Sequence, residues 1–378
     1  MKSKKLYSYI IPIVIVIGVV SLLGLKDNVY SGSNSVSFNI PMHEKHRGVC
    51  WVGSSTVVDA ATMKILADKH VNWISQTPFG WQSGHDNPSI GNNRRMGDDS
   101  RVWWGERDAG LKTTTKLAKS YGISTILKPH IWLRDKEGKW RGEISMKSEE
   151  DWQKWFADYE EFILHYAEVA EEANMEMLCI GTELHKTCIE REQDWRSLIK
   201  KIRAVYSGKL TYAANFSMEF EEITFWDELD YIGVQAYFPL TVKENPSLEE
   251  VRAGWQPHLE KLKAFSDKFE KPILFTEAGY KSTLNSGIEP WEWPQRLSKE
   301  ERESIYSEDT QATLYEAMFR EVFDQPFIAG IHLWKWYPNY SKPKDDNSDR
   351  RRFYDIDFTP QGKKAEQVMI DWYSKFSQ

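Results

Sequence analysis

Hydrophobic and polar positions alternate along the chain in two different patterns. Short apolar runs, most of them rich in Ile, Val, Leu and Phe, are separated by longer stretches in which apolar residues recur at helical spacing. The short runs are typical of buried strands, and the longer stretches are typical of amphipathic helices. The sequence therefore predicts strands at residues 48–53, 71–77, 123–129, 175–181, 209–214, 230–236, 272–276 and 328–334.

Helices are expected between most of these strands and after the last one. They are predicted at residues 59–70, 112–121, 149–174, 195–206, 248–269, 307–323 and 362–376. Strands that alternate with helices form parallel β/α units. Eight strands in this order close into a barrel, so we expect an α/β protein with a single (β/α)8 TIM barrel over residues 47–378. Neither an internal repeat nor a linker to a second domain is visible.

The N-terminus carries a hydrophobic segment of a different kind. Three lysines precede an apolar stretch from Leu6 to Leu25, and about 20 such residues span a bilayer. No clean small-residue cleavage site is evident, so we expect residues 1–25 to be a membrane anchor. The alternative is a signal segment whose cleavage would leave a secreted protein. The lysines should stay in the cytoplasm, which places the catalytic domain outside it. Residues 26–46 are polar and predict a tether.

Composition and charge narrow the choice of partners. The chain is 41% hydrophobic and 28% charged, as in globular proteins, and its net charge is −7. No basic tract follows the extreme N-terminus, which argues against nucleic acid as a partner. Three cysteines do not indicate a disulfide framework. No Cys/His spacing resembles a zinc site, so neither a metal nor a cofactor is expected. The sequence does not predict an oligomeric state.

Two glutamates follow predicted strands at the point where each strand ends. Glu183 comes after the run at 175–181, and Glu277 comes after the run at 272–276. The C-terminal ends of barrel strands meet at the active-site face. Two carboxyl groups facing one pocket can cleave a glycosidic bond, because one protonates the departing oxygen while the other attacks or activates water. Each glutamate alone could be a strand-end charge or a helix cap, but the pair favours catalysis.

Other polar and aromatic residues follow the strands or occupy two long connections, residues 78–105 and 279–306. An asparagine or a histidine can hold sugar hydroxyls, a tyrosine can donate to the nucleophile, and a tryptophan offers a flat apolar surface to a sugar ring. The chain has 17 tryptophans, although any one in a loop could instead fold back onto the barrel. The candidate substrate-binding residues are Trp51, Trp81, Lys128, His130, Trp132, Asn215, Tyr237 and Trp334.

The chain resembles the clan A glycoside hydrolases, and within them glycoside hydrolase family 113, which contains β-1,4-mannanases. The resemblance covers residues 47–376. It is carried by the segments Leu127–His130, Trp140–Ile144, Trp152–Tyr159, Ile180–Leu184, Leu210–Asn215 and Phe275–Tyr280.

This resemblance implies a role for each glutamate. Glu183 becomes the acid/base and Glu277 the nucleophile of a retaining double displacement, which needs their carboxyl groups about 5–5.5 Å apart. The chain departs from the pattern at Thr182, where most of the clan has Asn. Asn215 is our candidate for holding the sugar 2-hydroxyl in its place.

The function expected from the sequence is thus a retaining β-glycoside hydrolase, with β-1,4-mannan or manno-oligosaccharides as substrate. One alternative is a hydrolase or transglycosylase that acts on another β-glycan. A second alternative is a carbohydrate-binding barrel without catalysis, and a third is a membrane-anchored structural or adhesion protein. The third alternative predicts no deep pocket at the C-terminal rim of the barrel.

Overall fold

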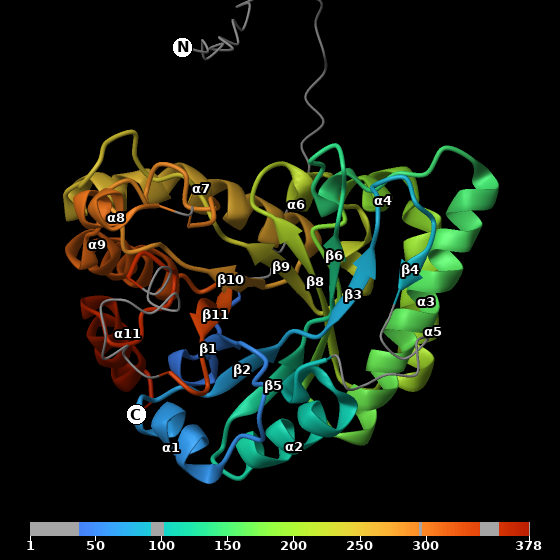
Figure 1. Cartoon of the computed structure of the whole chain (residues 1–378), viewed down its shortest axis with the longest axis horizontal. Helices are drawn as coiled ribbons and strands as arrows, with labels where there is room; N and C mark the ends of the chain where they lie inside the picture. The colour runs from blue at the N-terminus through green and yellow to red at the C-terminus, as the bar shows by residue number, and fades with distance from the viewer. Residues whose placement is uncertain (1–37, 92–101, 295–296, 341–354, 378) are drawn as a thin grey trace, which may run out of the picture. The chain divides into compact units, whose positions relative to one another are not determined.

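Eight parallel strands close into a barrel in the computed structural model, which describes residues 38–91, 102–294, 297–340 and 355–377 (Figure 1). Neighbouring strands follow the order β1-β11-β10-β9-β8-β7-β5-β2, and β1 also pairs with β2. The strands are β1 (His46–Trp51), β2 (Trp73–Gln76), β5 (Ser124–Leu127), β7 (Met177–Thr182), β8 (Lys209–Asn215), β9 (Tyr231–Gln235), β10 (Ile273–Ala278) and β11 (Ile328–Trp336). The predicted (β/α)8 barrel and all of its strands are confirmed.

The helices surround these strands (Figure 1). Those that correspond to predicted helices are α1 (Ala60–Asp68), α2 (Asp108–Lys119), α3 (Glu149–Glu172), α5 (Glu192–Val205), α7 (Leu248–Phe269), α9 (Glu308–Met318) with the π-helical turn η6 (Phe319–Phe323), and α11 (Lys364–Lys375). Local chemistry sets their starts: Ser247 caps α7 by accepting a hydrogen bond from Glu250 N, and the Glu250 side chain accepts from Ser247 N in return.

Several short elements were not predicted. They are the helices α4 (His185–Glu190), α6 (Glu219–Glu222) and α8 (Lys299–Ile305), and the 3₁₀ turns η1 (Met42–Glu44), η3 (Trp104–Glu106), η4 (Arg141–Glu143) and η5 (Phe225–Glu228). Each spans two turns or less, a length at which hydrophobic periodicity gives no usable signal.

A small second sheet stands beside the barrel, where the sequence had predicted only loops. It consists of β3 (Phe79–Gln82), β4 (Ile90–Gly91) and β6 (His130–Leu133), with β3 parallel to β6. Pro78 and Pro129 lie just before β3 and β6. Because proline has no N–H to donate, the barrel ladder between β2 and β5 ends there. The predicted strand at 123–129 is therefore shortened to β5, and the separate strand β6, which carries His130 and Trp132, pairs with β3 instead.

The barrel interior is packed at its N-terminal end. Ile126, Met177, Cys179, Ala213, Leu274 and Ala329 form an inner apolar cluster. His332 contributes a polar layer, since its ring contacts Ser75 Oγ at 2.7 Å and His46 Nδ1 at 3.1 Å. Burial lowers the pKa of both imidazoles, that of His46 to about 3, so both are neutral. Gly48 makes room for this layer, because a Cβ there would lie 2.6 Å from the His332 ring.

The folded domain begins before Arg47, the start predicted from the sequence. Phe38, Ile40 and Met42 pack against the core, and Lys45 is fully buried with its ammonium donating to Phe323 O at 2.5 Å and Gln325 O at 2.7 Å. The predicted anchor, residues 1–25, lies outside the described residues. Within the residues that are described, none of the helices is both long and apolar enough to cross a bilayer.

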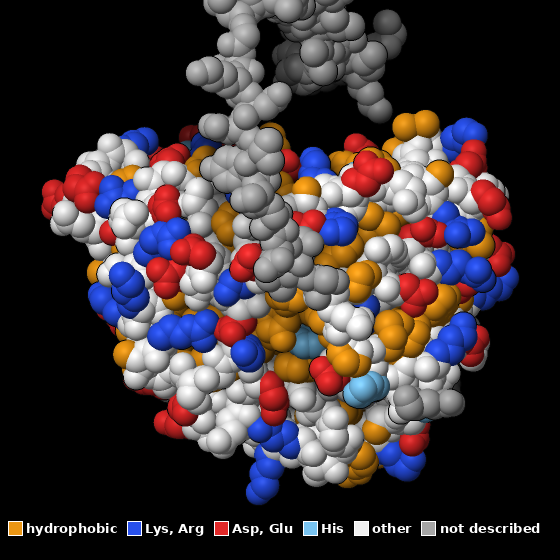
Figure 2. Space-filling model, turned by 180° about the vertical axis from the view of Figure 1, so that it is seen from behind, with side chains coloured by type: hydrophobic (Ala, Val, Ile, Leu, Met, Phe, Trp, Pro, Cys, Tyr) orange, Lys and Arg blue, Asp and Glu red, His pale blue; other side chains and the backbone are white. Residues whose placement is uncertain are grey.

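Many of the charged surface pairs are exposed. Figure 2 shows basic and acidic side chains interspersed over the face that it presents. Lys64–Asp68 and Lys263–Asp267 are typical i,i+4 pairs, both at 2.6 Å. Exposed pairs of this kind contribute about 0–1 kcal/mol each. Buried aromatic packing between helices and strands, such as Trp155 stacked on Tyr159 at 4.9 Å, therefore dominates the stability.

Candidate active site

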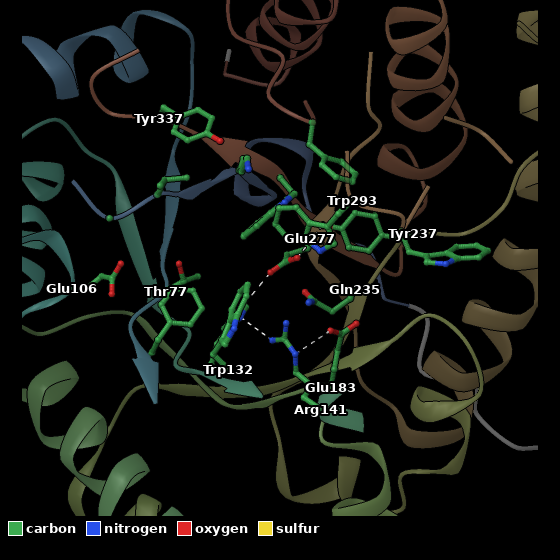
Figure 3. Close-up of a pocket in the computed structure, with 18 of the residues that line it drawn as sticks. Thr77, Glu106, Trp132, Arg141, Glu183, Gln235, Tyr237, Glu277, Trp293 and Tyr337 are labelled. Atoms are coloured by element: carbon green, nitrogen blue, oxygen red, sulfur yellow. Dashed lines mark hydrogen bonds and ion pairs between the residues drawn. The ribbon is translucent and has the colours of Figure 1, made fainter. Parts of the chain in front are cut away.

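A cavity of about 350 Å³ opens at the C-terminal ends of the barrel strands (Figure 3). Glu183 and Glu277 both line it, although they are far apart in the sequence. Strand register shifts occur just before each of them, between Cys179 and Thr182 against β8 and between Phe275 and Glu277 against β9. Such bulges turn side chains out of the regular alternation of a strand. They direct both carboxyl groups to the same cavity.

Glu277 is held by two buried donors. Lys128 Nζ lies 2.5 Å from Oε1, and Tyr237 donates its hydroxyl to Oε2 at 2.9 Å. Burial is the largest single effect and lowers the pKa of Lys128, but the charge of Glu277, the hydrogen bond to it and the nearby Cys50 and Cys179 together raise the pKa above its usual value. Burial also raises the pKa of Tyr237 well above its usual value, so the phenol remains a donor. The ammonium and the phenol thus each donate to one oxygen of the Glu277 carboxyl group.

Glu183 has a backbone conformation that few residues other than glycine adopt. Its φ is 51°, in the left-handed region, where non-glycine residues cost on the order of 1–3 kcal/mol. Two hydrogen bonds hold it there: Glu183 N donates to Ala213 O at 2.9 Å, and Leu184 N donates to the Tyr212 hydroxyl at 2.6 Å. Asn215 Nδ2 donates to Glu183 Oε1 at 2.7 Å and fixes the carboxyl group itself.

The electrostatic setting of Glu183 differs from that of Glu277. Burial raises the pKa of Glu183, and the negative charge of Glu277 adds to this effect. Arg141 and the Asn215 hydrogen bond act in the opposite direction, but the net shift is upward. One carboxyl group of the cavity therefore favours the protonated form while the other is paired with a cation. This division suits an acid and a nucleophile.

His130 and Arg141 connect the two carboxyl groups. Arg141 Nη1 lies 3.1 Å from His130 Nδ1, and Arg141 Nε lies 3.8 Å from Glu183 Oε2. Burial, Lys128 and Arg141 all lower the pKa of His130, so the ring is neutral. Because arginine can only donate, Nδ1 accepts and Nε2 carries the proton. This N–H has no hydrogen-bond partner among the described residues, and Glu277 Oε1 is 3.8 Å away.

A buried glutamate supports the Glu183 side of the site from behind. Glu219 contacts the Tyr212 hydroxyl at 2.6 Å through Oε1 and accepts from Asn215 N at 2.6 Å through Oε2. It is fully buried, and burial raises its pKa to about 8. Tyr212 and Asn215 in turn hold Leu184 N and the Glu183 carboxyl. Glu219 thus supports two of the three hydrogen bonds that position Glu183.

The structure brings most of the predicted site residues together. The residues that line the cavity are Glu183, Glu277, His130, Trp132, Tyr237 and Trp334. Lys128 and Asn215 contact the two carboxyl groups from outside the cavity lining. Asn215 is the candidate for holding the sugar 2-hydroxyl. Its side-chain amide donates to Glu183 Oε1, and its side-chain oxygen accepts a hydrogen bond from Ser217 N at 2.9 Å.

Trp51 and Trp81 do not line the cavity. Trp51 is 2% exposed and belongs to the outer core. Strand alternation explains this, because its neighbour Cys50 faces the barrel interior, where its thiol contacts Thr276 O and His332 O. Trp81 lies in β3, where the Arg134 guanidinium covers its ring at 4.4 Å.

Several residues of the cavity were not among the predicted ones. They are Thr77, Phe79, Trp103, Glu106, Arg141, Gln235, Trp291, Trp293, Lys335, Tyr337 and Phe358, besides the backbone of Val52 and Gly53. Trp103, Trp291 and Trp293 lie in the two long connections, and Glu106 directly follows the first of them. The high tryptophan content of these loops was the signal that could have indicated these cavity residues. Arg141 lies in the segment Trp140–Ile144, which carries part of the family resemblance. Nothing local marks Thr77 or Tyr337.

The residues described contain no cluster of three His, Cys, Asp or Glu side chains that could hold a metal ion. His185 contacts Glu222 at 2.5 Å outside the cavity, and His332 lies inside the barrel. Cys50, Cys179 and Cys188 are free and buried. Burial raises the pKa of Cys50 to about 12 and of Cys179 to about 11, so these thiols are poor nucleophiles.

The fold and the paired carboxyl groups define a glycoside hydrolase of the barrel class, and sequence comparison agrees. The family model of Glycoside Hydrolase Family 113 matches residues 51–362. The chain belongs to glycoside hydrolase family 113, and it is an enzyme. This excludes the non-catalytic binding barrel and the adhesion protein considered above. No curated protein matches the sequence.

Solved structures are similar over nearly the whole chain. The GH113 β-mannanase AaManA from Alicyclobacillus acidocaldarius, in complex with ManMIm, is 28% identical with a TM-score of 0.71, and the match covers 90% of this chain and 99% of that one. A GH113 β-1,4-mannanase structure is 25% identical with a TM-score of 0.71, covering 88% and 99%. A β-glucuronidase from Ruminococcus gnavus, 14% identical with a TM-score of 0.55 over 87% of this chain and 50% of that one, shares the fold alone.

Proposed function

We propose that the protein is a retaining β-1,4-mannanase that cleaves mannan or manno-oligosaccharides, with Glu183 as acid/base and Glu277 as nucleophile. The observation that carries the proposal is the opposite setting of two carboxyl groups on one cavity. Burial raises the pKa of Glu183, whereas Lys128 and Tyr237 hold the Glu277 carboxylate. A general acid must keep its proton and a nucleophile must be ionised.

In the first step, Glu277 attacks the anomeric carbon while Glu183 donates its proton to the departing glycosidic oxygen. The C–O bond to the leaving sugar breaks as the bond to the Glu277 carboxylate oxygen forms. His130 Nε2–H lies beside Glu277 without a partner among the described residues, so it can donate to a hydroxyl of the reacting sugar. Tyr237 and Lys128 keep the attacking carboxylate in place during this step.

In the second step, the same pair releases the sugar. Forming the ester removes the negative charge of Glu277, one of the causes that raise the pKa of Glu183. The pKa of Glu183 then falls, and Arg141 and Asn215 stabilise its ionised form. Glu183 can now take a proton from water, which attacks the anomeric carbon and frees Glu277. The configuration at the anomeric carbon is retained.

Exposed aromatic side chains support a saccharide as the ligand. Contiguous exposed apolar patches often mark ligand-binding grooves. Trp103, Trp132, Trp291 and Trp293 are between 41% and 55% exposed, and all four line the cavity. Their apolar faces can stack on the C–H faces of sugar rings.

The choice of mannan rests on similarity. The GH113 structures that match nearly the whole chain are described as β-mannanases. Hydrolysis of another β-glycan, or transfer of the glycosyl group to a sugar acceptor, would use the same two glutamates. Product analysis on mannan, glucan and xylan, with defined manno-oligosaccharides as a further series, distinguishes these possibilities.

Substitution tests the two roles separately. Glu277→Gln should abolish hydrolysis of an activated aryl β-mannoside, because no nucleophile remains. Glu183→Ala should still form the glycosyl-enzyme from this substrate, whose leaving group needs no proton, and azide should then speed its release as a β-glycosyl azide. NMR of the first sugar product should show the β-anomer. Parent-like rates in both variants, or an α-anomer as first product, would refute the mechanism.

We further infer, from the sequence alone, that residues 1–25 anchor the enzyme in a membrane with the barrel outside the cytoplasm. An external hydrolase can reach a polymer that does not enter the cell. Fractionation of cells that express the full chain should place it in the membrane pellet after an alkaline carbonate wash. A shortened protein in the medium, with an N-terminus beyond residue 25 by mass, would show a cleaved segment instead.

A further inference from the structure

A third carboxyl group lines the active-site cavity besides those of Glu183 and Glu277. It belongs to Glu106, the last residue of η3, and its side chain is partly buried. Figure 3 shows Glu106 beyond Thr77, on the opposite side of the cavity from Glu183. Neither step of the proposed mechanism uses it.

The position of Glu106 is fixed by tight backbone packing. Gly105 N donates to Ser54 O at 2.8 Å, and a Cβ on Gly105 would lie 2.6 Å from Ser54 N. The Glu106 side chain rests on Gly53 in the segment that follows β1, where a Cβ would lie 2.8 Å from Glu106 Cγ. A braced turn therefore presents this carboxyl group to the cavity, and a larger residue at Gly53 or Gly105 would displace it.

Glu106 differs from the other two carboxyl groups in having no partner in the part of the chain that the structure describes. Its side chain makes neither a hydrogen bond nor an ion pair with any residue that the structure describes. Of the Lys and Arg side chains that line the cavity, Lys335 pairs with Asp357 at 3.3 Å, and Arg141 lies 3.8 Å from Glu183. Burial raises the pKa of Glu106 to about 7. Removing a carboxyl group from water without a partner is costly, and a ligand with hydroxyl groups would offset that cost.

We propose that Glu106 is a substrate-binding residue whose carboxylate accepts hydrogen bonds from hydroxyl groups of a sugar unit adjacent to the reacting one. Its two oxygens can accept from two neighbouring hydroxyls at once, and hydrogen bonds to a charged acceptor are the stronger kind. Trp103, 55% exposed and lining the same cavity, offers this sugar an apolar face. The assignment rests on the proposed function, since it requires an oligosaccharide in the cavity.

Kinetics of Glu106→Gln on manno-oligosaccharides of increasing length test the assignment. Glutamine keeps the size of the side chain but removes its charge and one acceptor. A contact made equally in the ground and transition states changes KM and not kcat. We expect KM for the longer oligosaccharides to rise about tenfold while kcat stays within about twofold of the parent, as for the loss of one charge-assisted hydrogen bond. KM for an aryl β-mannoside, which fills fewer sugar positions, should change less.

Glu292→Gln is the matched control, because it makes the same substitution on the loop between Trp291 and Trp293 without lining this cavity. It should keep the parent KM on every substrate. If Glu106→Gln also keeps the parent KM on every oligosaccharide, or lowers kcat with KM unchanged, the assignment is overturned. Thermal unfolding of both variants checks that the fold is retained.

A binding measurement separates this inference from the proposed function. Calorimetric titration of mannohexaose into Glu277→Gln and into the Glu277→Gln, Glu106→Gln double variant measures affinity without turnover. Binding about tenfold weaker in the double variant supports the assignment, and equal affinity overturns it. A parent enzyme that cleaves no manno-oligosaccharide refutes the proposed function. A parent that cleaves them, beside a Glu106→Gln variant with the same KM, refutes only the inference.

Discussion

The ammonium of Lys128 lies 2.5 Å from the carboxylate Oε1 of Glu277, and neither side chain is more than slightly exposed. A buried ion pair is expensive to break from one side, because the remaining charge stays in a poorly solvating environment. Lys128 also donates to Thr276 O at 3.1 Å, so it links the Glu277 carboxyl group to the backbone of its own strand. The pair therefore connects the stability of the barrel rim to the chemistry of the cavity.

Replacing Lys128 by methionine should damage both properties. We expect kcat/KM on an aryl β-mannoside to fall about 100-fold or more, as when one preorganised donor is removed from a catalytic site. The free energy of unfolding should fall by about 3–5 kcal/mol, because Glu277 loses its buried partner. Kinetics and urea titration measure the two effects.

Lys281→Met provides the control for this substitution. Lys281 is also buried, at 5% exposed, but makes no hydrogen bond or ion pair with the residues described, and burial lowers its pKa. Losing its charge should leave kcat/KM near the parent value and should not reduce stability. If Lys128→Met behaved like Lys281→Met, the pair with Glu277 would have no catalytic importance.

Asn215 should set the alkaline limit of activity through Glu183. Its amide donates to Glu183 Oε1 at 2.7 Å and lowers the pKa of that carboxyl group, against the larger effect of burial. In Asn215→Ala the pKa of Glu183 should therefore rise further. The alkaline limb of the pH profile of kcat/KM, where the general acid loses its proton, should move to higher pH.

Asn339→Ala is a suitable comparison, because Asn339 donates to Ser54 Oγ at 3.0 Å and does not contact Glu183. Its pH profile should coincide with that of the parent. An alkaline limb that moved to lower pH in Asn215→Ala would contradict the proposed role of Glu183 as the acid.

The sequence was sufficient for the barrel and for the two glutamates that line its cavity, because both follow from local patterns. The strands coincide with short apolar runs; Glu183 directly follows β7, and Glu277 is the penultimate residue of β10. The side of the barrel wall to which a strand residue points is harder to predict from the local sequence. Trp51 was expected at the cavity, but Cys50 occupies the inward position and Trp51 faces the helices. Side chains along β1 alternate between the inside and the outside of the barrel. This alternation gives the direction of Trp51 only once one inward-facing residue of the strand is known.

The remaining site residues come from segments whose positions depend on distant contacts. Arg141 lies in a 3₁₀ turn and reaches the cavity because His130 in β6 holds its guanidinium. β6 itself exists because Pro129 interrupts the barrel ladder and the chain pairs with β3 instead. Glu106 is placed by packing between Gly105 and the segment after β1. None of these relationships has a periodic signature, so pattern analysis could indicate the loops but not their contacts.

The aromatic lining should contribute to substrate affinity and little to the chemical step. Trp132 is 42% exposed and lines the cavity, whereas Trp140 is 41% exposed and does not. We expect Trp132→Ala to raise KM for manno-oligosaccharides about tenfold, since an aromatic contact contributes about 0.5–1.5 kcal/mol beyond area burial. Trp140→Ala, with the same loss of exposed ring, should leave KM near the parent value. Equal effects of the two substitutions would show that stacking in this cavity is unimportant.

Glu219 should make the stability of the enzyme fall as the pH rises. It is fully buried, and burial raises its pKa from 4.5 to about 8 in the folded protein. Between these two values the folded state binds the proton more tightly than the unfolded chain does. The contribution of Glu219 is therefore fully present below pH 4.5 and is lost as the pH rises through about 8. The total is on the order of a few kcal/mol.

Glu219→Gln imitates the protonated acid and keeps a group of the same size between Tyr212 and Asn215. The variant should therefore be close to the parent in stability near pH 5 and more stable than the parent near pH 8, a difference that urea unfolding at several pH values can measure. Glu260→Gln, on the exposed face of α7, should follow the parent at every pH. A difference between Glu219→Gln and the parent that did not grow with pH would mean that Glu219 is ionised in the folded enzyme. In that case a second negative charge, and not a neutral acid, would stand behind Asn215 and Glu183.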